Sequence, residues 1–308
     1  MSAEGEEPKV TVDLFDDEIF EDEPRPVRKS AREPRPPRKK RRRGSGETAK
    51  RILVALPWIV FAIAITVAGG IVFTLAMIAI GVVALREFDA IARRHRPLII
   101  PAYIAVAGLV LAARFGTAFN VLYVLAASFL LIFAFVARPQ NQQGATVSMG
   151  VTLLGVLWIG IPLAHAVLLR DLPSHGAALL IDVLVGTFVA DTAAYATGRM
   201  FGSHKITPNI SPNKTIEGLV GGFVIGTMGF WFAGLYQDWL SGVDALLIGA
   251  AVAAVAPIGD LFESMLKRDL GTKDTGTIFG PHGGLLDRLD AVFFTVVVGY
   301  YLAVALVY

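Results

Sequence analysis

The chain of 308 residues contains no cysteine. This absence excludes disulfide bonds, a thiol nucleophile and any zinc site that depends on cysteine ligands. Charge is also sparse, since Asp, Glu, Lys and Arg make up 18% of the residues while hydrophobic residues make up 54%. A chain this poor in charge and this rich in apolar residues is typical of polytopic membrane proteins.

Much of the charge lies in the first fifty residues, which are acidic at first and then basic and rich in proline. Low hydrophobicity combined with dense charge and proline predicts a disordered tail over residues 1–50. The basic block Arg38–Arg43 precedes the first apolar run, where it can set the topology or bind anionic headgroups. No aromatic residues and no folded element that could recognise bases accompany it, so nucleic-acid binding is not expected. No secretory signal is visible before the first apolar run.

Residues 51–308 are expected to form one membrane domain of about nine transmembrane helices, because a helix needs about twenty residues to cross a bilayer. The fold class predicted is therefore an all-α polytopic integral membrane protein with a disordered N-terminal tail. Glycines recur inside the apolar runs and predict close helix packing in lipid, for instance at Gly218, Gly221, Gly222 and Gly226. The expected spans are Ile52–Val67, Gly69–Leu85, Leu98–Ala113, Ala118–Val136, Val147–Leu169, Ala177–Ala196, Ile216–Tyr236, Ala245–Ile258 and Ala291–Tyr308.

The basic residues outside the tail are distributed unevenly over the loops between these spans. If the tail is cytoplasmic, the loops on the opposite side keep only Arg114 and Arg170. By the positive-inside rule this bias predicts a cytoplasmic tail and an external C-terminus. Both polar stretches of the membrane domain, Gly198–Thr215 and Asp260–Arg288, then face the cytoplasm, where a nucleotide would be found.

One stretch, Asp260–Asp290, interrupts the apolar C-terminal half and is expected to form a loop between the last two spans. It contains five Asp, one Glu, two Lys, two Arg and one His. Ionisable groups at a membrane boundary are costly and usually mark function. Carboxylates can hold Mg²⁺, Lys and Arg can hold phosphate oxygens, and glycines let the backbone approach a ligand. The stretch therefore predicts a metal-dependent, phosphate-handling site.

Three carboxylates of this stretch are the candidates for a metal role. Asp260 ends the eighth span, and Asp287 and Asp290 lie three residues apart, hence on one face of a helix, at the start of the ninth. Consecutive spans tend to be neighbours, and three converging carboxylates would repel one another without a bound cation. Glu263 and Asp274 are further candidates. The alternative is that these acids are helix-end charges that face the headgroups.

The second polar stretch contains Ser211-Pro212-Asn213-Lys214-Thr215-Ile216-Glu217-Gly218. Pro212 sets a rigid turn, and Thr215 can cap the helix that follows. Lys214 beside the free N–H groups of a helix start would form a phosphate-binding site. An ordinary loop with a helix cap is the alternative interpretation.

Both stretches resemble the bacterial phosphatidate cytidylyltransferases, a family that makes CDP-diacylglycerol and pyrophosphate from CTP and phosphatidate. Residues 211–218 match the upstream S-P-x-K-T-x-E-G element of that family throughout. Ala190 is a departure, since Asn is expected there in many relatives. The residues that carry the C-terminal signature are Ser264, Lys267, Arg268, Lys273, Asp274, Gly276, His282, Gly283, Gly284, Asp287, Arg288 and Asp290.

The resemblance implies a nucleotidyltransferase with CTP and membrane phosphatidate as substrates and Mg²⁺ as cofactor, held by Asp260 and Asp287. A second cation and a homodimer remain open. The predicted catalytic residues are Asp260, Asp287, Lys273, His282 and Asp290. The predicted substrate- and phosphate-binding residues are Ser211, Lys214, Ser264, Lys267, Arg268, Asp274 and Arg288.

Two other functions are alternatives to this one. A CTP-dependent polyprenol or lipid kinase also couples membrane helices to a nucleotide site, but it does not explain the complete C-terminal signature. A secondary transporter would place its ionisable residues near mid-membrane and show internal repeats. Here the charge lies at the predicted cytoplasmic boundary, and no repeat is visible.

Overall fold

The computed structural model describes residues 45–137, 144–276 and 283–308, with side chains from Pro57 onward. Most of the tail predicted to be disordered, residues 1–50, lies outside these ranges, as does His282. Residues Ile52–Tyr308 form one compact unit, which contains all of the predicted site residues.

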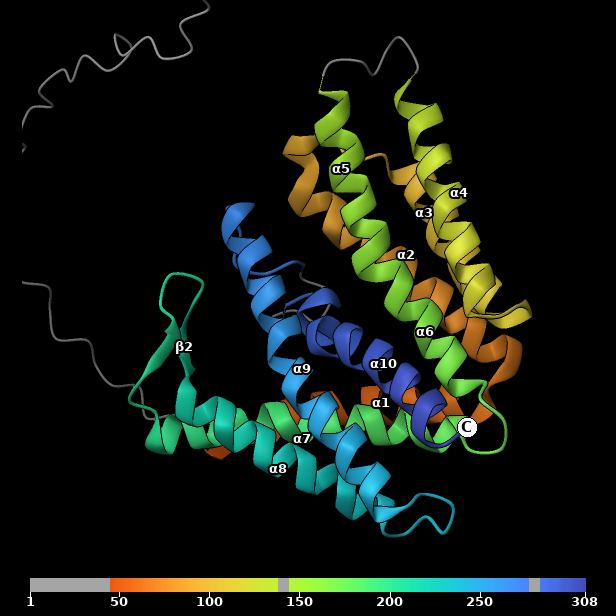
Figure 1. The fold of residues 1–308 in the computed structure, drawn as a ribbon. Coiled ribbons are helices and arrows are strands. Elements are labelled where there is room, and N and C mark those ends of the chain that lie inside the picture. Colours follow the sequence, from red (N-terminus) through yellow and green to blue (C-terminus); the bar gives the residue numbers. More distant parts are fainter. Residues whose placement is uncertain (1–44, 138–143, 277–282) are drawn as a thin grey trace, which may run out of the picture. The chain divides into compact units, whose positions relative to one another are not determined.

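This unit is built almost entirely from helices (Figure 1). Seven helices of the described part are long and apolar enough to cross a membrane, whereas Pro57–Ala68 and Ile99–Phe115 are shorter. The predicted all-helical membrane protein is confirmed, and its count of nine spans is approximate. The helices are α1 (Ser45–Ala68), α2 (Gly70–Ala92), α3 (Ile99–Phe115), α4 (Ala118–Val136), α5 (Ala145–Gly155), α6 (Ile161–Arg170), α7 (Gly176–Phe201), α8 (Ile216–Gly234), α9 (Gly242–Asp269) and α10 (Leu286–Leu306). A π-helical segment, η4 (Val156–Gly160), joins α5 to α6, and a 3₁₀ turn, η2 (Arg93–His95), follows α2.

The polar stretch that was expected to be a loop is helical over its first ten residues. Helix α9 continues to Asp269, and α10 begins at Leu286. The residues after Asp260 include good helix formers, and Glu263 and Lys267 form an ion pair at the i, i+4 spacing that stabilises a helix. The charged side chains of this segment are consequently spaced along one rigid helix rather than spread over a loop.

The second polar stretch forms a small hairpin, the exception to the all-α prediction among the described residues. Strands β1 (Lys205–Thr207) and β2 (Ser211–Thr215) pair antiparallel between the end of α7 and the start of α8 (Figure 1). Thr215 caps α8, because its hydroxyl accepts a hydrogen bond from the N–H of Gly218 at 3.1 Å. The predicted helix cap is therefore confirmed.

Helices α7 and α8 lie side by side (Figure 1), and small residues form their contact. A Cβ atom at Gly222 would lie 2.7 Å from the Cβ of Ala194, and one at Gly226 would lie 2.6 Å from the Cβ of Ala190. The predicted close packing at these glycines is confirmed. Ala190, the departure noted above, is 2% exposed in this contact, so a small side chain suits the position.

Trp158 holds together the helices that lead to the site. Its ring lies 6.0 Å from that of Phe88 on α2, 5.4 Å from Phe262 on α9 and 6.3 Å from Phe293 on α10, measured between ring centroids. Aromatic rings in such edge-to-face contacts contribute beyond their buried area. This cluster fixes α2, η4, α9 and α10 to one another within about one turn of the charged residues described next.

Candidate active site

Lys267 lies between two carboxylates from different helices. Its Nζ is 2.6 Å from Glu263 Oε2 on α9 and 2.7 Å from Asp287 Oδ1 on α10. The side chains are 15% exposed for Lys267, 2% for Glu263 and 10% for Asp287, so little water reaches these charges. Their attraction is therefore screened far less than that of a surface pair.

The second oxygen of Asp287 organises the start of α10. Oδ2 accepts hydrogen bonds from the N–H of Gly284 at 2.7 Å and from the N–H and hydroxyl of Thr275, each at 3.0 Å. Gly283 has a φ of +87°, and a Cβ there would lie 2.5 Å from Asp287 Oδ2, so the position requires glycine. Asp287 thus links Thr275, which follows α9, to Gly284, which precedes α10.

Lys214 joins the hairpin to α9. Its Nζ lies 2.7 Å from Asp260 Oδ2 and donates a hydrogen bond to the carbonyl of Pro257 at 3.3 Å. The hydroxyl of Ser264, one turn later, is 3.4 Å from Asp260 Oδ1. Two N–H groups at the start of α8 already have acceptors within the protein. The N–H of Ile216 donates to the carbonyl of His204, and the N–H of Gly218 donates to the hydroxyl of Thr215. The free N–H groups that were expected to bind phosphate beside Lys214 are therefore partly hydrogen-bonded within the protein itself.

Three carboxyl groups from three helices interact electrostatically with one another near the Lys214–Asp260 ion pair. Asp191 on α7, Asp260 on α9 and Asp290 on α10 lie within electrostatic range of one another, and Lys214 interacts with Asp191 as well. Helices α9 and α10 touch here, because a Cβ at Gly259 would clash with the carbonyl of Asp290 and lie 2.9 Å from Ala291 Cα. The cluster thus brings Asp191 and Asp260 within range of Lys214, and Asp290 within range of Lys267.

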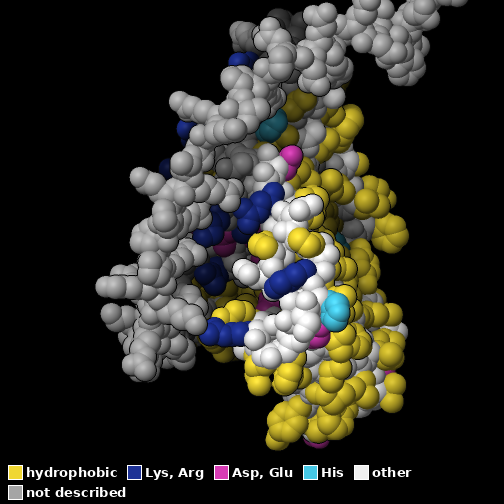
Figure 2. Space-filling view, turned by 90° about the vertical axis from the view of Figure 1, so that its left-hand side faces the viewer, with side chains coloured by type: hydrophobic (Ala, Val, Ile, Leu, Met, Phe, Trp, Pro, Cys, Tyr) yellow, Lys and Arg dark blue, Asp and Glu magenta, His cyan; other side chains and the backbone are white. Residues whose placement is uncertain are grey.

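Basic side chains gather on one part of the molecular surface. Figure 2 shows Lys and Arg gathered on one part of the visible face, with acidic side chains between them and apolar side chains over much of the rest. Arg268 is exposed, and its Nε donates to the carbonyl of Ile210 in the hairpin at 3.3 Å. Such a surface suits an anionic ligand that approaches from an aqueous side.

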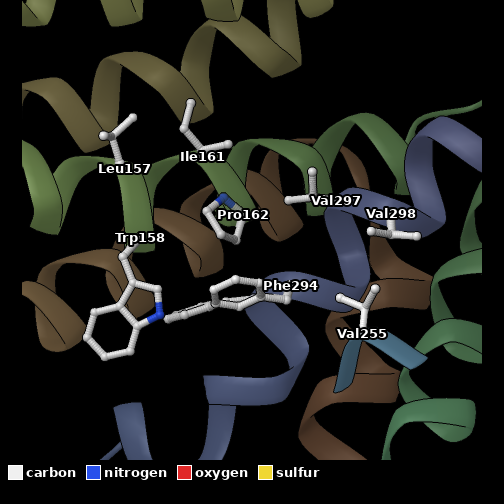
Figure 3. Close-up of a pocket in the computed structure, with 9 residues that line it drawn as sticks. Leu157, Trp158, Ile161, Pro162, Val255, Phe294, Val297 and Val298 are labelled. Atoms are coloured by element: carbon white, nitrogen blue, oxygen red, sulfur yellow. The ribbon is translucent and has the colours of Figure 1, made fainter. Parts of the chain in front are cut away.

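An apolar cavity of about 260 Å³ lies between η4, α6, α9 and α10. Phe293 and Phe294 follow Asp290 by about one helical turn, and Val255 precedes Asp260 by more than one turn. In Figure 3, Phe294, Val297 and Val298 lie across the cavity from Leu157 and Ile161. The full lining is Leu157, Trp158, Ile161, Pro162, Val255, Phe293, Phe294, Val297 and Val298.

Comparison with known families decides what kind of protein carries this arrangement. A family model described as the cytidylyltransferase family matches residues 49–306, which is nearly the whole membrane unit. The chain belongs to the cytidylyltransferase family.

Curated relatives agree with this membership. The chain is 28% identical over 251 residues to the phosphatidate cytidylyltransferase of Staphylococcus saprophyticus, which covers 79% of this chain and 94% of that protein. It is 42% identical over 132 residues to the phosphatidate cytidylyltransferase of Thermotoga maritima, covering 41% and 48%. It is also 33% identical over 184 residues to the uncharacterized protein YnbB of Escherichia coli, covering 58% and 62%. The match thus spans only part of the length of the last two proteins.

The donor set of the site fits a magnesium ion, the cofactor expected for this cytidylyltransferase. All candidate ligands are carboxylate oxygens, the type that Mg²⁺ prefers, and Glu263 Oε1 is buried with no hydrogen-bond partner among the described residues. In that part of the chain no group of three or more His, Asp or Glu side chains could hold a metal by itself. Mg²⁺ commonly takes one or two carboxylates and completes its shell with water and substrate phosphates, so such a group is not required.

The structure brings together some of the residues predicted for the site and leaves others at its edge. Asp260, Asp290, Lys214 and Ser264 meet around the acidic cluster, and Lys267 and Asp287 form the neighbouring ion-paired group. Ser211 pairs with Thr207 in the hairpin and is half-buried. The remaining predicted residues that are described are exposed: Arg268, Lys273, Asp274 and Arg288.

Three further acids of this cytidylyltransferase take part in the arrangement. Asp191 was not among the predicted site residues, and it interacts electrostatically with Asp260 and Asp290. Glu263, a further metal candidate, binds Lys267 through Oε2. Glu87 on α2 was not predicted at all. It is 5% exposed and accepts hydrogen bonds from the N–H groups of Leu285 and Leu286, each at 2.9 Å. Its position on the buried face of a helix, between Ala84 and Phe88, was the available signal.

Proposed function

We propose that this protein is a phosphatidate cytidylyltransferase, which converts CTP and phosphatidate into CDP-diacylglycerol and pyrophosphate. The observation that carries the proposal is the arrangement of Asp191, Asp260 and Asp290 beside Lys214, with Lys267 bridging Glu263 and Asp287, in a member of the cytidylyltransferase family. Two relatives aligned with this chain bear the name phosphatidate cytidylyltransferase.

The reaction joins two anions. A phosphate oxygen of phosphatidate attacks the α-phosphorus of CTP, a new P–O bond forms, and the bond to the pyrophosphate leaving group breaks. A phosphate monoester is already ionised near neutral pH, so the attacking oxygen needs no strong base. The main tasks of the protein are therefore to neutralise charge and to hold the groups in line.

The charged side chains divide these tasks between them. The ammonium groups of Lys214 and Lys267 lie close to the acids and can turn toward phosphate oxygens, while the exposed Arg268, Lys273 and Arg288 attract the nucleotide. Asp260 and Asp287 would hold Mg²⁺, which when bound offsets charge on the phosphates and on the leaving group. Each of these two carboxylates contacts a lysine ammonium, which would have to move toward the substrate phosphates when the ion binds.

The apolar cavity of Figure 3 supports a lipid substrate. It lies between α6, α9 and α10 and is lined by apolar side chains, about one to two turns below Asp260 and Asp290. We place part of an acyl chain of phosphatidate there, which leaves the phosphate headgroup near the charged residues. We also propose that the charged end of the helices faces the cytoplasm at the inner membrane, because of the bias of basic residues in the loops and because CTP is available there.

The decisive test incubates purified full-length protein with phosphatidate, Mg²⁺ and each nucleoside triphosphate in turn, and assays for liponucleotide and pyrophosphate. We expect CDP-diacylglycerol from CTP. Nucleoside diphosphate together with a newly phosphorylated lipid would instead identify a CTP-dependent lipid kinase. No reaction with any triphosphate would contradict the proposal.

The Asp287→Asn variant tests the assignment of the site within this assay. It keeps the size of the side chain but removes the charge that faces Lys267 and the proposed cation, so turnover should fall roughly a hundredfold or more. The matched control is Asp244→Asn, because Asp244 lies at the other end of α9, where it binds Ser241. Near-normal turnover of Asp287→Asn with an unchanged Mg²⁺ requirement would remove Asp287 from the site.

A further inference from the structure

Glu87 connects the first half of the membrane unit to the start of α10. It lies on α2, about 200 residues before its partners in the sequence, and is 5% exposed. Oε1 accepts a hydrogen bond from the N–H of Leu285 and Oε2 from the N–H of Leu286, each at 2.9 Å. A buried carboxylate that accepts two backbone hydrogen bonds is held in one position far more firmly than a surface acid.

The backbone at two glycines packs closely against the carboxylate of Glu87. A Cβ at Gly276 would lie 2.5 Å from Glu87 Oε1, and a Cβ at Gly284 would lie 2.5 Å from Oε2. The hydroxyl of Thr275 is 3.5 Å from Glu87 Oε2 and 3.0 Å from Asp287 Oδ2. Because a hydroxyl has a single hydrogen to donate, the shorter distance assigns it to Asp287. Thr275 therefore lies between the two carboxylates.

Helix α10 depends on this distant residue because it has no side-chain cap of its own. Its N-cap is Leu285, which cannot accept a hydrogen bond through its side chain. The N–H groups at a helix start require acceptors and favour negative charge. Asp287 accepts the hydrogen bond from the N–H of Gly284, and Glu87 accepts those from the N–H groups of Leu285 and Leu286. Both oxygens of Glu87 are used as acceptors, which glutamine, with one acceptor oxygen, cannot reproduce.

We propose that Glu87 is a positioning residue for cytidylyl transfer: it caps α10 from α2 and so sets where Asp287 and Asp290 lie relative to Lys267 and Asp260. This inference rests on the proposed function, since the reaction supplies one of its readouts. It assigns to α2, which carries none of the residues predicted from the sequence, a direct part in organising the site.

The test compares Glu87→Gln with Asp89→Asn in the full-length protein. Asp89 lies two residues later on α2 and makes no hydrogen bond or ion pair with the residues that the structure describes, so the same chemical change there serves as the control. For Glu87→Gln we expect kcat per folded molecule to fall by about tenfold or more, because displacements of about 1 Å at reacting groups are costly. The KM for phosphatidate should change less than about twofold, and Asp89→Asn should behave like the parent protein.

A role in stability alone gives a different result. Glu87→Gln would then lower the yield or the unfolding temperature while kcat per folded molecule stayed normal, and this outcome would overturn the proposal. Thr275→Val provides a second check, since it removes the hydroxyl between the two carboxylates at nearly constant size. If the residues act through one arrangement, the double variant should lose less than the product of the two single losses. Strictly independent losses would contradict that arrangement.

Hydrogen exchange separates this inference from the proposed function. Amide exchange in peptides that cover residues 283–291 should be faster in Glu87→Gln than in the parent protein, and unchanged in Asp89→Asn. Unchanged exchange in Glu87→Gln would overturn the positioning role whether or not the protein makes CDP-diacylglycerol. Faster exchange in a protein that performs no cytidylyl transfer would remove the proposed function and the catalytic part of the inference, and leave only the cap.

Discussion

Replacement of Lys267 by methionine tests the electrostatic description of the site most directly. The change removes the ammonium and keeps an unbranched side chain of similar length. In the native protein this ammonium lies 2.6 Å from Glu263 and 2.7 Å from Asp287, whose side chains are 2% and 10% exposed. Without it, two poorly hydrated carboxylates face each other with no cation between them.

The magnitude follows from the burial of these partners. Removal of one member of a buried ion pair typically costs about 3–5 kcal/mol, because the remaining charge is left uncompensated. We therefore expect Lys267→Met to lower the free energy of unfolding by about 3–5 kcal/mol. The measurement is unfolding of the detergent-solubilised protein by SDS titration, followed by circular dichroism. The control is Lys205→Met on the exposed hairpin, which should change the free energy of unfolding by less than about 0.5 kcal/mol.

A second substitution shows whether charge is the cause. Glu263→Gln added to Lys267→Met removes one of the two facing charges, so the double variant should recover a measurable part of the lost stability. The explanation is refuted if Lys267→Met costs less than about 1 kcal/mol, or if Glu263→Gln destabilises the variant further. Either result would mean that water or a proton compensates the two acids, and that Lys267 is not needed between them.

Three further predictions concern the backbone, the topology and the tail. Gly283→Ala should lower both turnover and unfolding temperature, because a φ of +87° and the contact with Asp287 Oδ2 exclude a Cβ, at a cost of at least about 1 kcal/mol; thermal unfolding and the liponucleotide assay measure both effects. Cysteines introduced at Ser203 or Thr272 of this cysteine-free chain should resist an impermeant thiol reagent applied to intact cells, and labelling from outside would reverse the proposed orientation. Deletion of residues 1–35 should leave specific activity within about tenfold, equivalent to about 1.4 kcal/mol, and a larger loss in correctly inserted protein would give the tail a catalytic role.

Local sequence determined most of the helices and several of their details. Apolar runs long enough to cross a bilayer must be helical there, because lipid offers no partner for backbone N–H and C=O groups. A threonine before a helical segment can satisfy an N–H group of the first turn, and glycines in membrane helices allow close approach. Thr215 and the pair Gly222 and Gly226 therefore behave as the sequence predicts, since their effects depend mainly on near neighbours. The residue types of the signature likewise indicate phosphate chemistry by themselves, because carboxylates, lysines and arginines have that chemistry wherever they lie.

Only the tertiary structure decided which charges meet. Lys267 was predicted to bind phosphate, but its partners Glu263 and Asp287 follow from the extension of α9 to Asp269 and from its packing against α10. Asp191 and Glu87 enter the site from helices whose sequences are mainly apolar. Such contacts join residues up to about 200 positions apart. Helix packing sets these distances through small-residue contacts and aromatic clusters, whereas local sequence patterns extend over only a few turns.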